Sequence, residues 1–215
     1  MSFLFPVVAA VLQAASFTID KITLNIKKFT YKNYNVVSFP LIFIFNVIIY
    51  FIFRPEISSE SFKGIFLLLL AVSISMSVIT NIIFYRALKS DELSEIQTIG
   101  MLNRVPVILF ASFFFPEERN LSVIILALIA AAALIWSHWE KHHFHVAKKT
   151  WPFLIWTLLI SPFGAVISKK LLEIWSPITL QLVEHAIMAL VFVVIYRKSF
   201  MTTPRKAIPY LVVTN

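Results

Sequence analysis

The chain has 215 residues, of which 59% are hydrophobic, 15% aromatic and only 14% charged, and it contains no cysteine. Soluble domains are roughly 45–50% apolar and about 25% charged, so this composition excludes a soluble enzyme and a disordered tail. The formal net charge of +8 is spread between long apolar runs instead of being gathered in one patch, which favours the loop charges of a polytopic membrane protein over nucleic-acid binding.

Seven stretches are long and apolar enough to cross a bilayer, because a spanning helix needs about 20 mostly apolar residues. In chain order they are 1–19, 36–53, 64–85, 93–115, 120–139, 150–168 and 177–196. An eighth apolar run opens at Ala207 and continues to Asn215, so we expect the native chain to continue beyond that residue. The connections between the stretches are short, which predicts an all-α integral membrane protein with no extramembrane domain.

Five of these stretches carry their few polar side chains on one helical face. The polar positions, stretch by stretch, are Gln13, Ser16 and Asp20; Ser73, Ser77, Thr80 and Asn81; Gln97, Gly100 and Arg104; Ser161, Gly164 and Ser168; and Gln181, Glu184 and His185. One interpretation is that five helices line a polar cavity. The other is that small and hydroxyl residues let helices pack closely and hydrogen-bond to one another, as in any membrane bundle.

Three charged residues lie within predicted spans, Glu95 near the start of the fourth and Arg104 and Glu184 deeper inside. Facing lipid, Arg104 and Glu184 would each cost at least about 2.5 kcal/mol near a helix centre. We therefore expect both to face the interior, either lining a cavity or pairing with each other. Glu184 next to His185 is also a candidate to carry a coupling proton.

Histidines cluster where the fifth stretch ends, at His138, His142, His143 and His145. The spacing of the first two is that of helical metal ligands, but aromatic and basic neighbours favour an interfacial anchor over a metal site. No phosphate loop, nucleophile elbow or paired carboxylates are found, so we expect no enzyme activity, no metal and no cofactor. Lysines at span ends, such as Lys21, Lys169 and Lys170, either reach toward the headgroups or bind anionic groups.

Several short segments resemble the drug/metabolite transporter superfamily, in particular its EamA type. Residues 13–21 (QAASFTIDK) are similar to the end of the family's first helix, with Gln13 in place of a tryptophan. Residues 84–89 (FYRALK) resemble the exit of the third helix, Pro106 matches a proline of the fourth, and residues 118–119 resemble the turn before the fifth. In the second half, residues 164–169 (GAVISK) echo residues 16–21, and Ser176-Pro177 matches the opening of the next helix.

This resemblance implies a bundle of two five-helix inverted repeats with a central cavity and alternating access. The first repeat would comprise residues 1–139, a linker residues 140–149, and a truncated second repeat residues 150–215. The family pattern places helices one, three, four and six along the substrate path. Where the family often has arginine, eight residues after the serine of Ser176-Pro177, this chain has Glu184.

We therefore expect a secondary transporter of a small polar metabolite, such as an amino acid, in the plasma membrane (the inner membrane of a bacterium). The candidate substrate path consists of Gln13, Ser16, Ser77, Asn81, Gln97, Arg104, Ser161, Gln181, Glu184 and His185. The alternative is a noncatalytic scaffold or assembly subunit whose polar stripes only hold helices together. The expected partners are a small solute and the lipid bilayer, without nucleic acid, and the oligomeric state is open.

Orientation is also open, because two criteria disagree. Thirteen of the 19 basic residues lie on the side of the first, third, fifth and seventh loops, which by the positive-inside rule places the N-terminus outside. The family pattern places the N-terminus in the cytoplasm.

Overall fold

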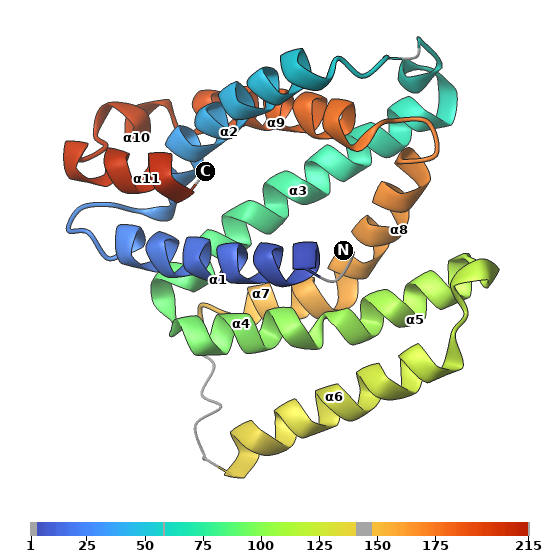
Figure 1. Ribbon diagram of the computed structural model, residues 1–215. Coiled ribbons are helices and arrows are strands. Elements are labelled where there is room, and N and C mark those ends of the chain that lie inside the picture. The colour runs from blue at the N-terminus through green and yellow to red at the C-terminus, as the bar shows by residue number, and fades with distance from the viewer. Residues whose placement is uncertain (1–3, 58, 141–147, 215) are drawn as a thin grey trace. The chain divides into compact units, whose positions relative to one another are not determined.

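The computed structural model describes residues 4–57, 59–140 and 148–214 (Figure 1). All regular structure in these ranges is helical and none is a β-strand, which confirms the all-α class. The longer α-helices are α1 (Leu4–Leu24), α2 (Tyr31–Phe53), α3 (Gly64–Ser90), α4 (Leu93–Leu102), α5 (Arg104–Phe114), α6 (Leu121–Glu140), α8 (Ser161–Leu171) and α9 (Pro177–Ile195). The shorter elements are η1 (Ser59–Phe62), η2 (Pro116–Glu118), α7 (Trp151–Ile155), η3 (Trp156–Ile160), α10 (Arg197–Met201), η4 (Arg205–Ala207) and α11 (Ile208–Thr214).

Six helical stretches in the described chain are long and apolar enough to cross a membrane, so this is an integral membrane protein. They are Val7–Leu24, Tyr31–Phe53, Gly64–Ser90, Leu93–Phe114, Trp151–Leu171 and Pro177–Ile195. The remaining predicted span, 120–139, corresponds to α6, whose apolar part Leu121–Ser137 is shorter than the other six. A total of seven spans therefore stays a prediction.

Two compact units make up the chain. The terminal unit contains Met1–Arg54 and Gln181–Asn215, and the central unit contains Pro55–Leu180. The bounds of these units differ from those of the predicted repeats, 1–139 and 150–215. The units are groups of residues in contact, whereas the repeats were predicted from sequence resemblance. The repeats therefore also stay a prediction.

Local chemistry explains why two helices of the terminal unit differ from their predicted bounds. The second begins at Tyr31, five residues earlier than expected, because Thr30 and Asn33 form a capping box in which the Asn33 side chain accepts from the backbone N–H of Thr30 at 3.0 Å. The first extends beyond Asp20 to Leu24, with Lys21 in its last turn, where a cation is favourable. Both helices are therefore longer than their predicted spans, and polar residues lie at the ends where they extend.

Side chains of α2 fasten the C-terminal segment of the chain within the terminal unit. The Asn33 amide donates to the backbone oxygen of Ser199, in α10, at 2.7 Å. Phe39 packs against Phe192, with ring centroids 4.7 Å apart, and Tyr31 meets Tyr196 edge-on. α11 contacts both α1 and α2. Residues from the two ends of the chain therefore share one core.

The central unit is built around α8, which contacts both α3 and α5. Gly164 lies at the approach to α3, where an added Cβ would be 3.2 Å from the terminal methyl of Met76 and would require that methyl to shift. On the α5 side, Phe110 and Phe163 pack edge to face with centroids 4.7 Å apart. Small and aromatic residues thus set the helix spacing, as expected where lipid supplies no hydrophobic driving force.

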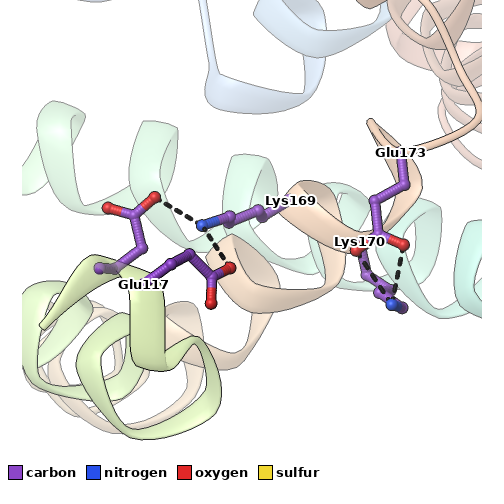
Figure 2. Close-up of polar contacts among 5 residues, drawn as sticks. Glu117, Lys169, Lys170 and Glu173 are labelled. Carbon is purple, nitrogen blue, oxygen red and sulfur yellow. Dashed lines mark hydrogen bonds and ion pairs between the residues drawn. The ribbon is translucent and has the colours of Figure 1, made fainter.

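Ion pairs join the end of α8 to the turn before α6 (Figure 2). Lys169 Nζ lies 2.5 Å from a carboxylate oxygen of Glu118 and 3.6 Å from one of Glu117, and 4.2 Å from the ring centroid of Phe115. Lys170 forms only a local pair, 2.8 Å long, with Glu173 three residues later. Lys169 therefore connects separate elements, whereas Lys170 does not.

We expect Lys169→Met to lower the thermal unfolding midpoint of the detergent-solubilised protein more than Lys170→Met does. The first substitution releases the contact between α8 and η2, while the second removes a pair within one segment. Because these side chains are about half exposed, the difference should shrink at high salt. Equal midpoints for the two variants at low salt would contradict a linking role for Lys169.

Candidate functional site

Two predicted spans of the central unit are interrupted near their middle. The stretch 93–115 divides into α4 and α5 at Asn103, where Pro106 deprives the carbonyl of Leu102 of its helical donor. The stretch 150–168 divides at the π-helical turn η3, in which the N–H of Ser161 bonds to the carbonyl of Trp156, five residues earlier. Pro162, which has no backbone N–H, follows directly. The wider π turn accommodates this missing donor while the helix continues.

The interruptions are neighbours in space, because α4 contacts η3. Around them lie polar groups whose hydrogen-bonding capacity is unused. Asn103 makes no side-chain cap to α5, and its buried Oδ1 has no partner in the described chain. Beside Gly100, a Cβ would meet no atom within 4 Å. Interrupted helices near mid-membrane are tolerated where they face protein or a water-filled cavity, and in transporters they commonly bind the substrate.

Arg104 is the first residue of α5 and lies halfway along the span Leu93–Phe114. Its side chain is exposed, and it forms no hydrogen bond or ion pair with any residue that the structure describes. A cation is unfavourable at a helix N-terminus, where the backbone dipole is positive. Arg104 lies at mid-span and at the helix N-terminus, and for both reasons a polar or anionic group in contact with its guanidinium would be favourable.

The other predicted path residues of the central unit are half-buried, and one of them is bonded locally. The Asn81 amide donates to the backbone oxygen of Ser77, one turn earlier, at 2.8 Å. Thr80, from the same stripe, accepts from the indole N–H of Trp156 at 2.8 Å and so connects α3 to η3. Gln97 and Ser161 lie on the two interrupted helices. Part of the α3 stripe thus serves helix packing, while the residues of the interruptions remain candidates for a path.

In the terminal unit a buried carboxylate lies where three helices meet. Asp20 of α1 is 2% exposed and accepts a hydrogen bond from the hydroxyl of Tyr34 of α2, 1% exposed, at 2.5 Å. It is also hydrogen-bonded to the side chain of Thr214 of α11. One turn earlier on α1, the Ser16 hydroxyl donates to the backbone oxygen of Thr214 at 3.4 Å. The stripe of α1 therefore faces α11, although Gln13, the first member, is exposed.

Asn35 adds a second unusual group to this unit. It follows Tyr34 directly in α2, is completely buried, and neither its amide nitrogen nor its amide oxygen has a partner in the described chain. Burying an amide without hydrogen bonds costs roughly 1–3 kcal/mol by protein mutational data. Such groups are retained in membrane bundles mainly where they serve a function.

Two members of the predicted polar stripe on α9 are in contact with each other. Half-buried His185 places its Nδ1 2.7 Å from the backbone oxygen of Gln181, which is exposed, and its ring stacks on Phe39. Glu184 is half-buried. Because it belongs to the terminal unit and Arg104 to the central one, their pairing stays a prediction.

Three of the clustered histidines, His142, His143 and His145, lie outside the described residues, as does the side chain of His138. Among the described residues no group of three or more histidines or acidic side chains is placed to hold a metal ion.

Sequence reasoning noted Asp20 only as the end of a stripe and missed Tyr34 and Asn35 altogether. One signal could have identified Asp20. The helix α1 continues for four residues beyond it, so this aspartate lies inside a helix and not at its end. Tyr34 and Asn35 lay in the polar connection between the predicted spans 1–19 and 36–53.

Comparisons with family models, with characterised proteins and with solved structures give no match to this chain.

Proposed function

We propose that this protein is a secondary transporter of the EamA type that moves a small polar metabolite, such as an amino acid, across the plasma membrane by alternating access. The observation that carries the proposal is the pair of neighbouring interruptions in the central unit. They supply a partnerless Asn103 oxygen, open space beside Gly100 and the unpaired Arg104. Half-helices of this kind bind solutes in known transporter architectures.

Within this proposal, the interruptions form part of the substrate path and the architecture is that of inverted five-helix repeats. Gln97, Arg104 and Ser161 would contact the solute, and Arg104 would hold a carboxylate by a bidentate pair. The motifs shared with the EamA type, described above, support the choice of family.

A scaffold or assembly subunit is the second candidate. The bond from Trp156 to Thr80 and the close approach at Gly164 favour it, because both use polar or small residues purely for packing. A scaffold has no need for a mid-span arginine without a partner, which is why we prefer transport.

Cysteine accessibility distinguishes the two, and the chain has no native cysteine to remove. Single cysteines replacing Arg104 and Ser161 should react in membranes with a charged, impermeant thiol reagent supplied from one side at a time. A cysteine replacing Leu126, exposed on α6, is the control and should stay unreactive in lipid. Transport is then measured by uptake and efflux of an amino-acid panel. If positions 104 and 161 are as unreactive as position 126 from both sides, no aqueous path passes the interruptions.

A further inference from the structure

We propose that Asp20 is the proton-binding site of this protein, and that binding and release of a proton there changes how α1, α2 and α11 are held together. The proposal rests on the proposed transport function for its purpose, which is to couple solute movement to a proton gradient. The site itself rests on the geometry of the terminal unit.

The carboxylate of Asp20 is buried, and none of the residues that the structure describes pairs it with a cation. Both partners that the structure gives it are hydroxyl-bearing side chains, Tyr34 and Thr214. A carboxylate withdrawn from water is costly in its ionised form unless it is paired, and it commonly binds a proton instead. In membrane helices, buried acids of this kind mark ion and proton pathways.

The three helices around Asp20 carry six other titratable groups, namely Lys21, Tyr31, Lys32, Tyr34, Tyr50 and Tyr210. Of these, only Tyr34 is hydrogen-bonded to the Asp20 carboxylate. Proton binding at Asp20 is therefore not compensated by release from a paired base. Each proton taken up or released changes the net charge of the site by one.

The two protonation states require different hydrogen bonds. An ionised carboxylate only accepts, and so it suits two hydroxyl donors on α2 and α11. When a proton binds, an O–H bond forms on the carboxyl, and this group becomes a donor that needs an acceptor. Asn35, the residue after Tyr34 in α2, is buried with an unused amide oxygen and an unused amide nitrogen. The unit thus holds spare polar capacity for a rearranged network.

The distance from Asp20 to the end of α1 is short. Asp20 lies four residues before the end of α1 at Leu24, which corresponds to roughly 6 Å along the helix axis at 1.5 Å per residue. Because Thr23 and Leu24 at the end of α1 are also buried, release of the proton to water at this membrane face requires the contacts around Asp20 to open. Glu184 and His185, the candidate pair from sequence for this role, lie farther from a helix end, seven and eight residues inside α9 from Pro177.

Infrared difference spectroscopy between acid and alkaline pH tests the site without any transported solute. The probe is the proton alone, applied to the full chain in lipid. Acidification should produce a protonated-carboxyl band that Asp20→Asn removes. Glu95→Gln, at another buried carboxyl, belonging to the central unit, is the matched control and should leave the Asp20 band in place. Asp20→Glu should restore a carboxyl band at a changed pH and covers the case in which Asp20→Asn does not fold.

A band that survives in Asp20→Asn at wild-type intensity would overturn the proposal. The result is separate from the fate of the transport function, because the spectrum needs no substrate. Where the amino-acid panel detects transport, Asp20→Asn should lose accumulation driven by a pH gradient and keep solute exchange across the membrane. Unchanged gradient-driven accumulation in that variant would equally overturn the coupling role.

Discussion

Tyr34→Phe should lower the free energy of unfolding by about 1–3 kcal/mol, the cost of leaving a buried polar partner with one hydrogen bond fewer. The substitution removes only the hydroxyl that donates to Asp20 at 2.5 Å, in a place where both residues are almost completely buried. Water cannot replace the lost donor there without opening the contact between α1 and α2. Thermal or denaturant unfolding of the detergent-solubilised protein measures the effect.

Tyr31→Phe is the matched control for this prediction. Tyr31 lies one turn earlier on α2 and packs edge-on against Tyr196, but its hydroxyl has no hydrogen bond in the described part of the chain. We expect a much smaller loss. In the variant that combines Tyr34→Phe with Asp20→Leu, the total loss should be less than the sum of the single losses, because the second change removes the carboxylate that the first had stranded. Strictly additive losses would show that the two side chains do not interact.

Pro162→Ala should raise the unfolding free energy and reduce transport at the same time. Alanine supplies the missing backbone donor at the junction of η3 and α8 and favours a regular α-helix through it. Because Pro162 lies in the first turn of α8, the gain should be smaller than the roughly 3 kcal/mol of a proline in a helix interior. If the π turn belongs to the substrate path, the straightened helix is more stable and less active, as is usual when strain serves function. Unfolding midpoints and amino-acid uptake of the same preparations are compared.

Pro152→Ala provides the control for position 162. Pro152 lies in the first turn of α7, where proline needs no N–H and is well tolerated. Both readouts should therefore stay near the wild-type values. If Pro162→Ala instead lowers stability, η3 is required for packing, and the case for a functional interruption is lost.

Hydrophobic run length predicted the existence and type of the helices well, because unpaired backbone groups in lipid leave little alternative to a helix. It could not predict the division of the stretch 93–115 at Asn103 or the π turn at Trp156–Ile160. Prolines were visible at 106 and 162, but whether a proline kinks, divides or widens a helix depends on the neighbours that satisfy the freed carbonyl. That information lies in packing, not in the local sequence.

The residues of the candidate sites could also be predicted only in part from the sequence. Arg104 was identified from sequence because a charge inside an apolar run is unmistakable. Asp20 was not, because it lies four residues from a helix end, where acids are common at the membrane surface. Its burial depends on Tyr34 and on Thr214, which lie in other helices, and such long-range contacts leave no periodic signal in a single sequence.

The contact between α1 and α11 has a consequence for biosynthesis. Ser16 and Thr214, which join these helices, are separated by 198 positions. At synthesis rates of about 5–20 residues per second, the second partner is made roughly 10–40 s after the first. During that interval α1 has already left the ribosome, and Asp20 has only Tyr34 available from the newly made chain. The contact between α1 and α11 therefore forms only after α11 has been made, and α1 waits for that segment in the membrane or the insertion machinery.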